Sequence, residues 1–320
     1  MTSRRNLLLA MSPLPALFHT GQTLAQNAPI RILVGAPAGG STDTLARNLA
    51  NEMGRQLGRI VVVENRPGAG GNIAADAVAK AAPDGNTLLM SFTSHAINAS
   101  LYPSLPFDPV KDFTALTCVA TSPSMLVANP SVPANDVREL IALAKARPGK
   151  LNFAIGAVGS SLHLAGDAFK MQSGTYIVNI PYRGTAPALQ DVLAGQVDLM
   201  FAAVGNAQAQ VRAGKLKALG VTSAKRLPAF PDVPAIAEVL PGYESSAWFG
   251  LFGPGNMAPE LAKRLSDAAR QAIATPEVKK RLETEGAIPV GNSPEEFGRF
   301  VQAEIPRWAK IVRFAGAKPE

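Results

Sequence analysis

The sequence predicts an α/β protein of two lobes, each a mixed or parallel sheet flanked by helices, joined by two crossing strands. Short apolar runs alternate with amphipathic segments from Arg31 onward, a pattern typical of parallel sheets. The pattern restarts near Pro130, and an apolar strand near Trp248 returns the chain to the first unit. At 320 residues, nearly half of them hydrophobic, the chain is long for one core and natural for two.

The first unit opens with a strand at residues 32–34, a glycine-rich turn from Gly35 to Thr42, and a helix near Asp43. We expect Thr42 or Asp43 to cap that helix. Such a turn aims free N–H groups and a helix dipole at one point, which suits a small carboxylate. The lysine of a P-loop is missing, so a nucleotide triphosphate is disfavoured. A plain strand-to-helix turn is the alternative.

Two more strands continue this unit. Residues 60–63 predict a second buried strand, and residues 87–91 predict a third. The loop after the third strand, which includes Ser94, should lie beside the first turn because the carboxyl ends of parallel strands share an edge. His95 in this loop is either a general base or, as we favour, a residue at the start of a helix.

The second unit repeats this chemistry. A strand at residues 151–155 leads into a second turn at Gly159, Ser160 and Ser161, and a helix follows. Two anion-cradling turns in successive α/β units favour a binding cleft between two lobes. The acidic residues Asp43 and Asp198 are candidates for recognising an amine, or else form a helix cap and a strand-end hydrogen bond.

Catalytic and metal-binding patterns are missing from the sequence. Ser160 and His163 lie three residues apart, but Leu162 replaces the last glycine of a G-x-S-x-G elbow. No metal-ligand motif occurs, and the single cysteine, Cys118, cannot form an intrachain disulfide and should be buried in a strand. We therefore expect a protein that is not an enzyme and needs no cofactor or metal.

The N-terminus predicts export. Residues 1–25 have Arg4 and Arg5, an apolar run and a cleavage site after Ala25, as in a secretory signal peptide. The arginine pair also partly resembles a twin-arginine export signal. Removing this segment lowers the formal charge from +7 to +5 because it contains two arginines and no acidic residue. The remaining basic residues are scattered, so we expect no nucleic-acid partner.

The chain resembles the Bug family, the extracytoplasmic solute receptors of tripartite tricarboxylate transporters. The resemblance runs from about Pro29 to the C-terminus. It is carried by VGAPAGGSTDTLAR, VVVENRPGAGGNIAADAVAKAAPDGNTLLM, LPFDPVKDF, GSSLHLAGDAFK and NIPYRGTAPALQDVLAGQVDLMF.

This resemblance implies a Venus-flytrap fold of the periplasmic binding proteins, with a carboxylate held between two lobes. We expect one lobe at 26–126 plus 248–320 and the other at 127–247. The implied ligand-binding residues are Ala38, Gly39, Gly40, Thr42 and Asp43 in the first turn, Gly159, Ser160 and Ser161 in the second, then Tyr182, Arg183, Gly184 and Asp198.

The resulting hypothesis is a monomeric periplasmic receptor that captures a small carboxylate, such as an organic acid or an amino acid, for membrane permease subunits. The apolar start of the second turn, Gly156-Ala157-Val158, disfavours a highly charged ligand such as citrate. Two alternatives are a ligand sensor that feeds a membrane signalling protein and an exported α/β hydrolase that uses Ser160.

Overall fold

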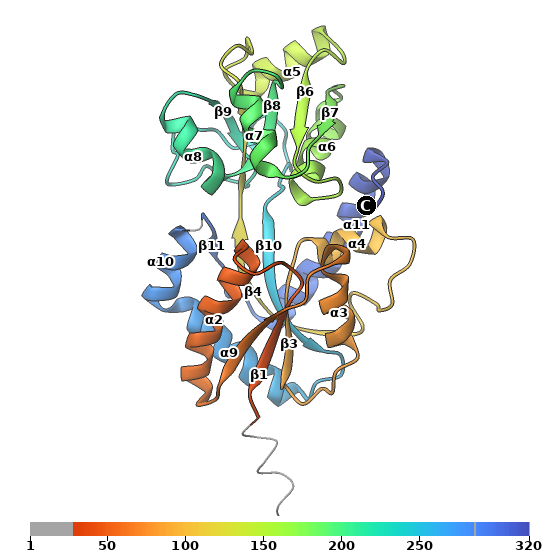
Figure 1. Cartoon of the computed structure of the whole chain (residues 1–320), viewed down its shortest axis with the longest axis vertical. Coiled ribbons are helices and arrows are strands. Elements are labelled where there is room, and N and C mark those ends of the chain that lie inside the picture. The colour runs from red at the N-terminus through yellow and green to blue at the C-terminus, as the bar shows by residue number, and fades with distance from the viewer. Residues whose placement is uncertain (1–27, 285, 320) are drawn as a thin grey trace, which may run out of the picture.

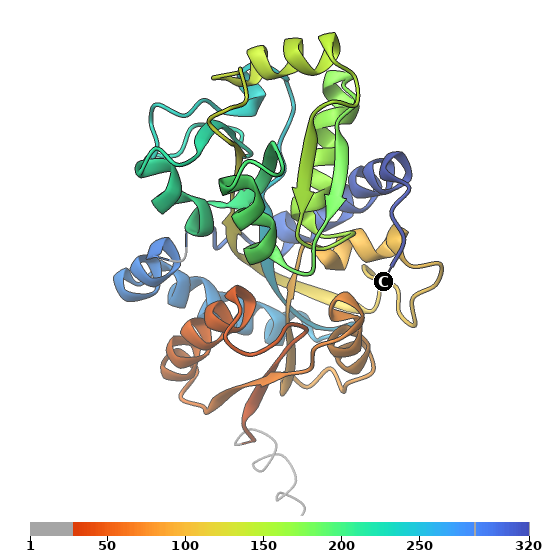
Figure 2. The ribbon, with the colours of Figure 1, turned by 45° about the horizontal axis from the view of Figure 1, so that its top comes forward.

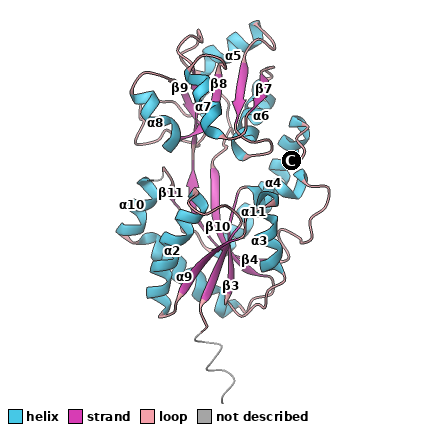
Figure 3. Ribbon diagram, in the orientation of Figure 1, coloured by secondary structure: helices cyan, strands magenta, loops and turns pink. Residues whose placement is uncertain are grey.

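The computed structural model describes residues 28–284 and 286–319, which form two lobes stacked end to end (Figure 1). The predicted signal peptide and its arginine pair lie outside the described residues. Each lobe has a central sheet with helices on both faces (Figure 3). The predicted α/β class with two mixed sheets is confirmed.

The first sheet has six strands in the order β11-β4-β10-β3-β1-β2. Strands β1, β2 and β3 are mutually parallel, whereas β10 is antiparallel to both β3 and β4. The strands are β1 (Ile30–Val34), β2 (Val61–Asn65), β3 (Thr87–Phe92), β4 (Phe113–Ser122), β10 (Ala247–Pro254) and β11 (Ile288–Pro289).

Helices cover both faces of this sheet. The side chains of β1 alternate: Ile32 and Val34 share an apolar core with α2 and α9, and Leu33 shares another with α3, α4 and α11. The helices are α2 (Ser41–Leu57), α3 (Asn72–Ala79), α4 (Ser94–Leu101), α9 (Pro259–Ala274), α10 (Pro276–Thr284) and α11 (Pro294–Ala315), with a 3-10 turn η1 (Ala69–Gly71).

The second sheet has five strands in the order β7-β6-β8-β5-β9. Alternate residues of β5 face opposite cores: Val127 packs with α7 and α8, and Leu126 with α5 and α6. The elements are β5 (Ser124–Ala128), α5 (Val137–Ala146), β6 (Asn152–Ile155), α6 (Ser161–Ser173), β7 (Val178–Pro181), α7 (Thr185–Leu193), β8 (Leu199–Ala203), α8 (Val204–Arg212), β9 (Lys217–Val221) and η2 (Ile236–Glu238).

The chain crosses between the lobes twice. Strand β4 leads directly into β5 through Pro123, and the chain returns through Ser246 into β10. Strand β5 lies wholly in the second sheet, so the first crossing precedes residue 126 by a few positions. We propose that these two crossings divide the lobes.

One side of the junction is filled by apolar side chains. Trp308 and Ile311 of α11 belong to the same buried cluster as Ala165 and Phe169 of α6, although α6 lies in the other lobe. The Tyr243 hydroxyl, in the segment before the second crossing, donates to the Ala165 carbonyl at 3.0 Å. The helix α11 therefore ties the two lobes together on this side.

Strand β2 differs from the prediction of a second buried strand. It is the edge strand of the first sheet, and Ile60 and Val62 are 69% and 41% exposed. An edge strand covered on one face keeps alternate side chains in water, which an unbroken apolar run does not reveal. Cys118 is buried inside β4 as predicted. No helix in the described ranges combines the length and apolarity needed to cross a bilayer.

Candidate functional site

The two sheets direct the carboxyl ends of their parallel strands at each other. Strand β4 runs toward the second lobe, and β1 and β3 run the same way because β10 is antiparallel to both β3 and β4. Strand β5 runs away from the junction, so β8, which is antiparallel to it, returns with β6 and β7. The arrows of β6 and β7 accordingly point toward the first lobe (Figure 2). The loops after these strands therefore face each other.

Turn 1, residues 35–40, joins β1 to α2. Gly39 has a positive φ of 80°, and Gly40 is the N-cap of α2 with no side chain bonded to the helix end. Both glycines are exposed. Within the described chain the backbone amides of Ser41 and Thr42 have no protein acceptor. These N–H groups and the dipole of a 17-residue helix are available to an anion.

The carboxylate of Asp43 braces turn 1, that is, it holds the turn in shape by hydrogen bonds. Its Oδ2 accepts from the Gly39 amide at 2.9 Å and from Arg47 Nε at 3.0 Å, and its Oδ1 accepts from Asn65 Nδ2 at 2.9 Å. Burial by itself would raise the pKa of Asp43, but the bonds from Arg47, Gly39 and Asn65 outweigh it and lower that pKa. The prediction that Thr42 or Asp43 caps the helix is wrong, because the helix begins at Ser41.

Turn 2, residues 156–160, joins β6 to α6 and has the same conformation. Gly159 has a φ of 73°, and the N-cap Ser160 has φ −69° and ψ 158°, close to −78° and 166° at Gly40. The Ser160 Oγ accepts from the His163 amide at 3.2 Å. The Gly159 amide donates to His163 Nδ1 at 3.0 Å, just as the Gly39 amide donates to a side chain four residues later.

A second loop lies against each turn at the same sheet edge. A Cβ at Gly35 would come within 2.6 Å of Gly71, in the loop after β2. A Cβ at Gly156 would come within 2.9 Å of Thr185, the first residue of α7, which directly follows the loop after β7. Both glycines are therefore required for the close approach of the two backbones, and each lobe presents a pair of adjacent loops.

Tyr182, Arg183 and Gly184 form the loop after β7. The Tyr182 amide donates to the Ile155 carbonyl at 2.8 Å, and the Tyr182 hydroxyl donates to Asp191 Oδ2 at 2.7 Å. Burial and the neighbouring Asp191 raise the pKa of Tyr182 to about 12. Tyr182 thus shapes the loop from within its own lobe, whereas the Arg183 side chain is exposed.

The helix α4 extends from the loop after β3, in the first lobe, to a contact with turn 2 in the second lobe. Ser94 is its first residue and follows β3 at the same edge as turn 1. Thr93 Oγ1 accepts from the Trp248 amide at 2.9 Å, which ties this loop to the second crossing strand. At the other end of α4, Leu101 packs against Gly159 of the second lobe.

Asp198 does not lie at the junction, so the prediction that it faces the cleft is wrong. It precedes β8, whose opposite end, at Ala203, pairs with Ser124 beside the crossing. Its carboxylate accepts from the Asn152 amide at 3.0 Å, at the start of β6. Burial raises the pKa of Asp198, and the bond from Asn152 only partly opposes this. A whole strand, about 16 Å of chain, separates Asp198 from the facing loops.

His95 is a core residue at the start of α4, as the sequence favoured. Its Nε2 lies 2.8 Å from the Pro109 carbonyl, and its ring packs on Phe113 and Phe252. Burial lowers its pKa to about 4, despite the bond to Pro109. Residues 28–284 and 286–319 contain no cluster of side chains suited to hold a metal ion.

The two brace residues were not recognised as such from the sequence. The sequence suggests Asp43 as a cap or ligand and pairs His163 with Ser160, but in the structure each side chain accepts from a glycine amide. The signal was available as a glycine followed four residues later by a hydrogen-bond acceptor, at Gly39 and at Gly159. Asn65, which supports Asp43 from β2, carries no such pattern.

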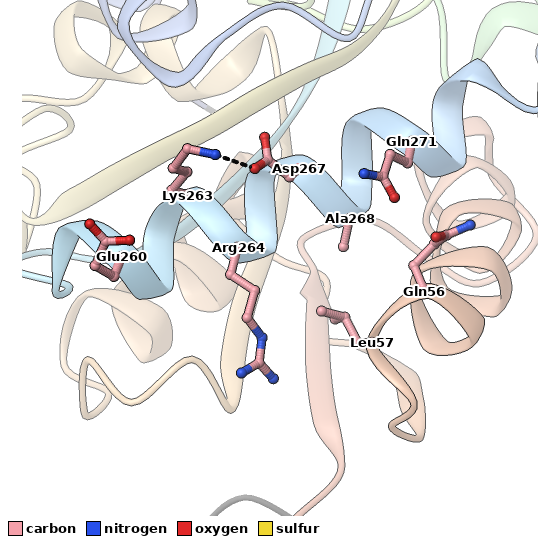
Figure 4. A pocket seen from close by; sticks show the side chains of 8 residues that line it. All are labelled: Gln56, Leu57, Glu260, Lys263, Arg264, Asp267, Ala268 and Gln271. Atoms are coloured by element: carbon pink, nitrogen blue, oxygen red, sulfur yellow. Dashed lines mark hydrogen bonds and ion pairs between the residues drawn. The ribbon is translucent and has the colours of Figure 1, made fainter.

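A depression of about 380 Å³ lies between α2 and α9 at the far end of the first lobe (Figure 4). Gln56 and Leu57 at the end of α2 contribute to it, about 25 Å along the helix from turn 1. Its other side carries charged side chains of α9, with Lys263 paired to Asp267 at 2.6 Å. This depression is separate from the facing turns.

Two α/β lobes joined by two crossing strands, with amide-rich turns facing across the junction, define a periplasmic solute-binding protein. The chain belongs to the tripartite tricarboxylate transporter receptor family, TctC, whose pattern matches residues 45–316. It is thus a periplasmic solute receptor and not an enzyme.

The relatives agree with this membership. The protein BugT of Bordetella pertussis is 40% identical over 293 residues, which cover 91% of this chain and 90% of BugT. An R. palustris structure with adipate is 36% identical, with a TM-score of 0.76 over 92% of this chain and 99% of that one. The structure of MatC from Rhodopseudomonas palustris with bound malate is 35% identical, with a TM-score of 0.72 over 89% and 99%.

Proposed function

We propose that this receptor captures a small carboxylate between its lobes and delivers it to the membrane subunits of a tripartite tricarboxylate-type transporter. The observation that carries the proposal is the pair of turns of equal conformation, one in each lobe, that present helix N-termini across the junction. The adipate and malate found with two relatives support a carboxylate as the ligand.

The proposed backbone donors are amides without an acceptor in the described chain, such as that of Thr42, because the Gly39 and Gly184 amides already donate to Asp43 and Gly156. In turn 1 we assign the exposed segment Ala38–Gly40 and the amide of Thr42. In the second lobe we assign turn 2 with Ser160 and Ser161, and Arg183 with Gly184 in the adjacent loop; Ser94 completes the set. Asp43 does not contact the ligand in this proposal, because both of its oxygens are already bonded within the lobe; it holds turn 1 in position.

The charges near the loops favour an anion. The N-terminal ends of α2 and α6 each carry a partial positive charge, and Arg183 adds a full one. The acidic side chain at turn 1, Asp43, is paired with Arg47 at 3.0 Å. A zwitterionic amino acid would need an acceptor for its ammonium group, so we favour an organic acid without an amine.

A carboxylate that contacts both turns binds best when the lobes are close. Binding would therefore shift the population toward the closed arrangement by the difference in affinity between closed and open forms. The transporter would recognise that closed form. We further propose that the N-terminal signal peptide directs the chain to the periplasm, where it acts as a monomer.

The test is a thermal-shift screen of the mature chain from Gln26 against malate, adipate and other organic acids and amino acids. A ligand at a hundred times its dissociation constant stabilises by about 2.7 kcal/mol, which is several degrees at this size. Mass spectrometry of the denatured protein identifies any ligand retained from expression. If no carboxylate shifts the protein and none is retained, the proposal fails.

Calorimetry of two leucine variants then tests the location. A Cβ at Gly40 would lie 3.4 Å from its nearest neighbour, so Gly40→Leu should fold and block turn 1. Gln56→Leu, at the exposed far end of the same helix, is the control. Affinity retained in Gly40→Leu would rule out turn 1 as the site. Ligand uptake by vesicles that contain the membrane subunits, with and without receptor, tests delivery.

A further inference from the structure

The braces of the two turns differ in one chemical respect. Turn 1 is held by the carboxylate of Asp43 and turn 2 by the imidazole of His163, through bonds of 2.9 and 3.0 Å to the matching glycine amides. We infer that His163 is a positioning residue for turn 2, and that protonation of its ring releases the turn and weakens ligand binding at acid pH. This inference rests on the proposed function for its effect on binding, but not for its effect on the turn.

The hydrogen bond from Gly159 fixes the state of one ring nitrogen. The Gly159 amide is a donor, so Nδ1 of His163 must present a lone pair. The single proton of the neutral ring is then on Nε2, which lies 2.9 Å from Asp167 Oδ2. A second proton can only go to Nδ1, where it would face the Gly159 N–H. Two donors cannot bond, so the charged ring cannot hold turn 2.

The surroundings of His163 reinforce this requirement. Asp167 is bonded to Lys170 Nζ at 2.5 Å, and His163, Asp167 and Lys170 are 5%, 1% and 9% exposed. Burial would raise the pKa of Asp167, but bonds from His163 and Lys170 lower it. The buried cluster is therefore neutral in sum while His163 is neutral, and it gains an uncompensated charge when the ring is protonated.

No other element supplies a charge that would offset that proton. Strand β7 contributes the uncharged amide of Asn179, whose Nδ2 lies 3.0 Å from His163 Nε2 and donates to Asp167 Oδ1 at 3.2 Å. The helix α4 contributes the apolar Leu101, which packs on Gly159. In the hydrogen bonds and ion pairs of the described residues, Asp167 is the one titratable group from any element bonded to the ring, with Lys170 behind it.

Turn 1 and the other described histidine do not share this sensitivity. The pKa of Asp43 is lowered because its hydrogen bonds outweigh the effect of burial, so it stays charged throughout the neutral range. Burial lowers the pKa of His95 to about 4. The response to acid that we infer should therefore arise at turn 2.

Two variants separate the acceptor from its titration. His163→Asn keeps an acceptor, and the Gly39–Asp43 bond shows that a side chain of this length reaches the amide in the same turn conformation. His163→Leu removes the acceptor and puts an apolar side chain in its place. Circular dichroism melts confirm that each variant is folded before binding is measured.

The first measurement needs no ligand. Nuclear magnetic resonance follows the Gly159 amide and the His163 ring in the free protein from pH 8 to pH 5. We expect both signals to move with one midpoint, and the Gly159 amide to lose that midpoint in His163→Asn. A Gly159 amide that ignores the titration of His163 overturns the inference, whether or not a carboxylate binds.

The second measurement is calorimetric titration with malate and adipate as probes over the same pH range. The linkage of one proton limits the loss of wild-type affinity to about tenfold per pH unit below the midpoint. We expect His163→Asn to bind as the wild type does at pH 8 without that loss, and His163→Leu to bind more weakly at every pH. An equal pH dependence in wild type and His163→Asn overturns the inference. If neither probe nor any other carboxylate binds, the proposed function fails. The measurement on the Gly159 amide then still decides whether His163 positions turn 2.

Discussion

The carboxylate of Glu304 should hold the second crossing strand to the C-terminal helix. Its Oε2 accepts from Trp248 Nε1 of β10 at 3.2 Å and from Trp308 Nε1 of α11 at 2.7 Å. Both indoles are fully buried, and Glu304 is 5% exposed. Its other oxygen pairs with the half-exposed Arg307. Glu304→Met removes the acceptor and keeps the volume, and Glu304→Gln is the matched control.

The two substitutions should differ widely in cost. Methionine leaves two buried indole N–H groups without an acceptor, and each orphaned donor costs about 1–3 kcal/mol. We therefore expect Glu304→Met to lose about 3–5 kcal/mol and about 5–10 °C in Tm. Glutamine can turn its carbonyl oxygen toward both indoles, so it should lose only the pair with Arg307, about 1 kcal/mol.

Urea unfolding followed by tryptophan fluorescence measures both effects. The sequence has two tryptophans, and both donate to this one carboxylate, so the emission reports the site directly. Emission should change in Glu304→Met and stay close to wild type in Glu304→Gln. If Glu304→Met lies within about 1 kcal/mol of wild type, the indole bonds do not hold β10 to α11 and the reasoning is refuted.

Two further predictions concern the acidic residues assigned from the sequence. Asp43→Ala should cost about 2–4 kcal/mol in urea unfolding, since three donors lose one buried acceptor. Because the pKa of Asp43 is lowered in the fold, the wild type's advantage is present above the ordinary carboxyl pKa of about 4 and is lost as the pH falls through the lowered value; an advantage unchanged in acid contradicts this. Asp198→Asn should leave affinity for the ligand within about twofold by calorimetry, as expected of a residue a strand away from the facing loops. A tenfold loss of affinity would mean that Asp198 belongs to the ligand-binding site.

The alternation of apolar strands and amphipathic helices was enough to predict the two α/β lobes. It could not reveal strand order, which depends on contacts distant in the sequence. The run at Ile60 shows the consequence, because the same residues read as buried although β2 lies at an edge. The prediction for Asp198 failed similarly. The sequence places it beside a strand, but only the pairing of β8 with β5 shows which end of that strand meets the other lobe.

The turns were more predictable than the groups that support them. Glycines and hydroxyl residues between a strand and a helix mark an anion-binding turn locally. The braces depend on which side chain reaches the amide of Gly39 or Gly159, and that requires the conformation of the turn. Asn65 is further removed, since it comes from a neighbouring strand to hold Asp43. Local chemistry thus predicted where a ligand goes, and tertiary contacts determine what holds the site in place.

The contact between Gly159 and Leu101 places turn 2 directly on the first lobe, and a double-mutant cycle measures it. A Cβ at Gly159 would lie 2.8 Å from Leu101 Cδ2, and the residue has a φ of 73°. Gly159→Ala should therefore cost about 1–2 kcal/mol for the left-handed backbone and about 1–3 kcal/mol for the contact. Gly174→Ala, at the other end of α6 with φ 62° and no neighbour within 4 Å, measures the backbone cost alone.

Adding Leu101→Ala should relieve the contact and leave the backbone cost. We expect a favourable coupling of about 1–2 kcal/mol between Gly159→Ala and Leu101→Ala, and none between Gly174→Ala and Leu101→Ala. Because α6 also packs on α11, such a coupling means that both turn 2 and the helix that follows it rest on the first lobe. Zero coupling in both pairs would mean that turn 2 moves freely with its lobe.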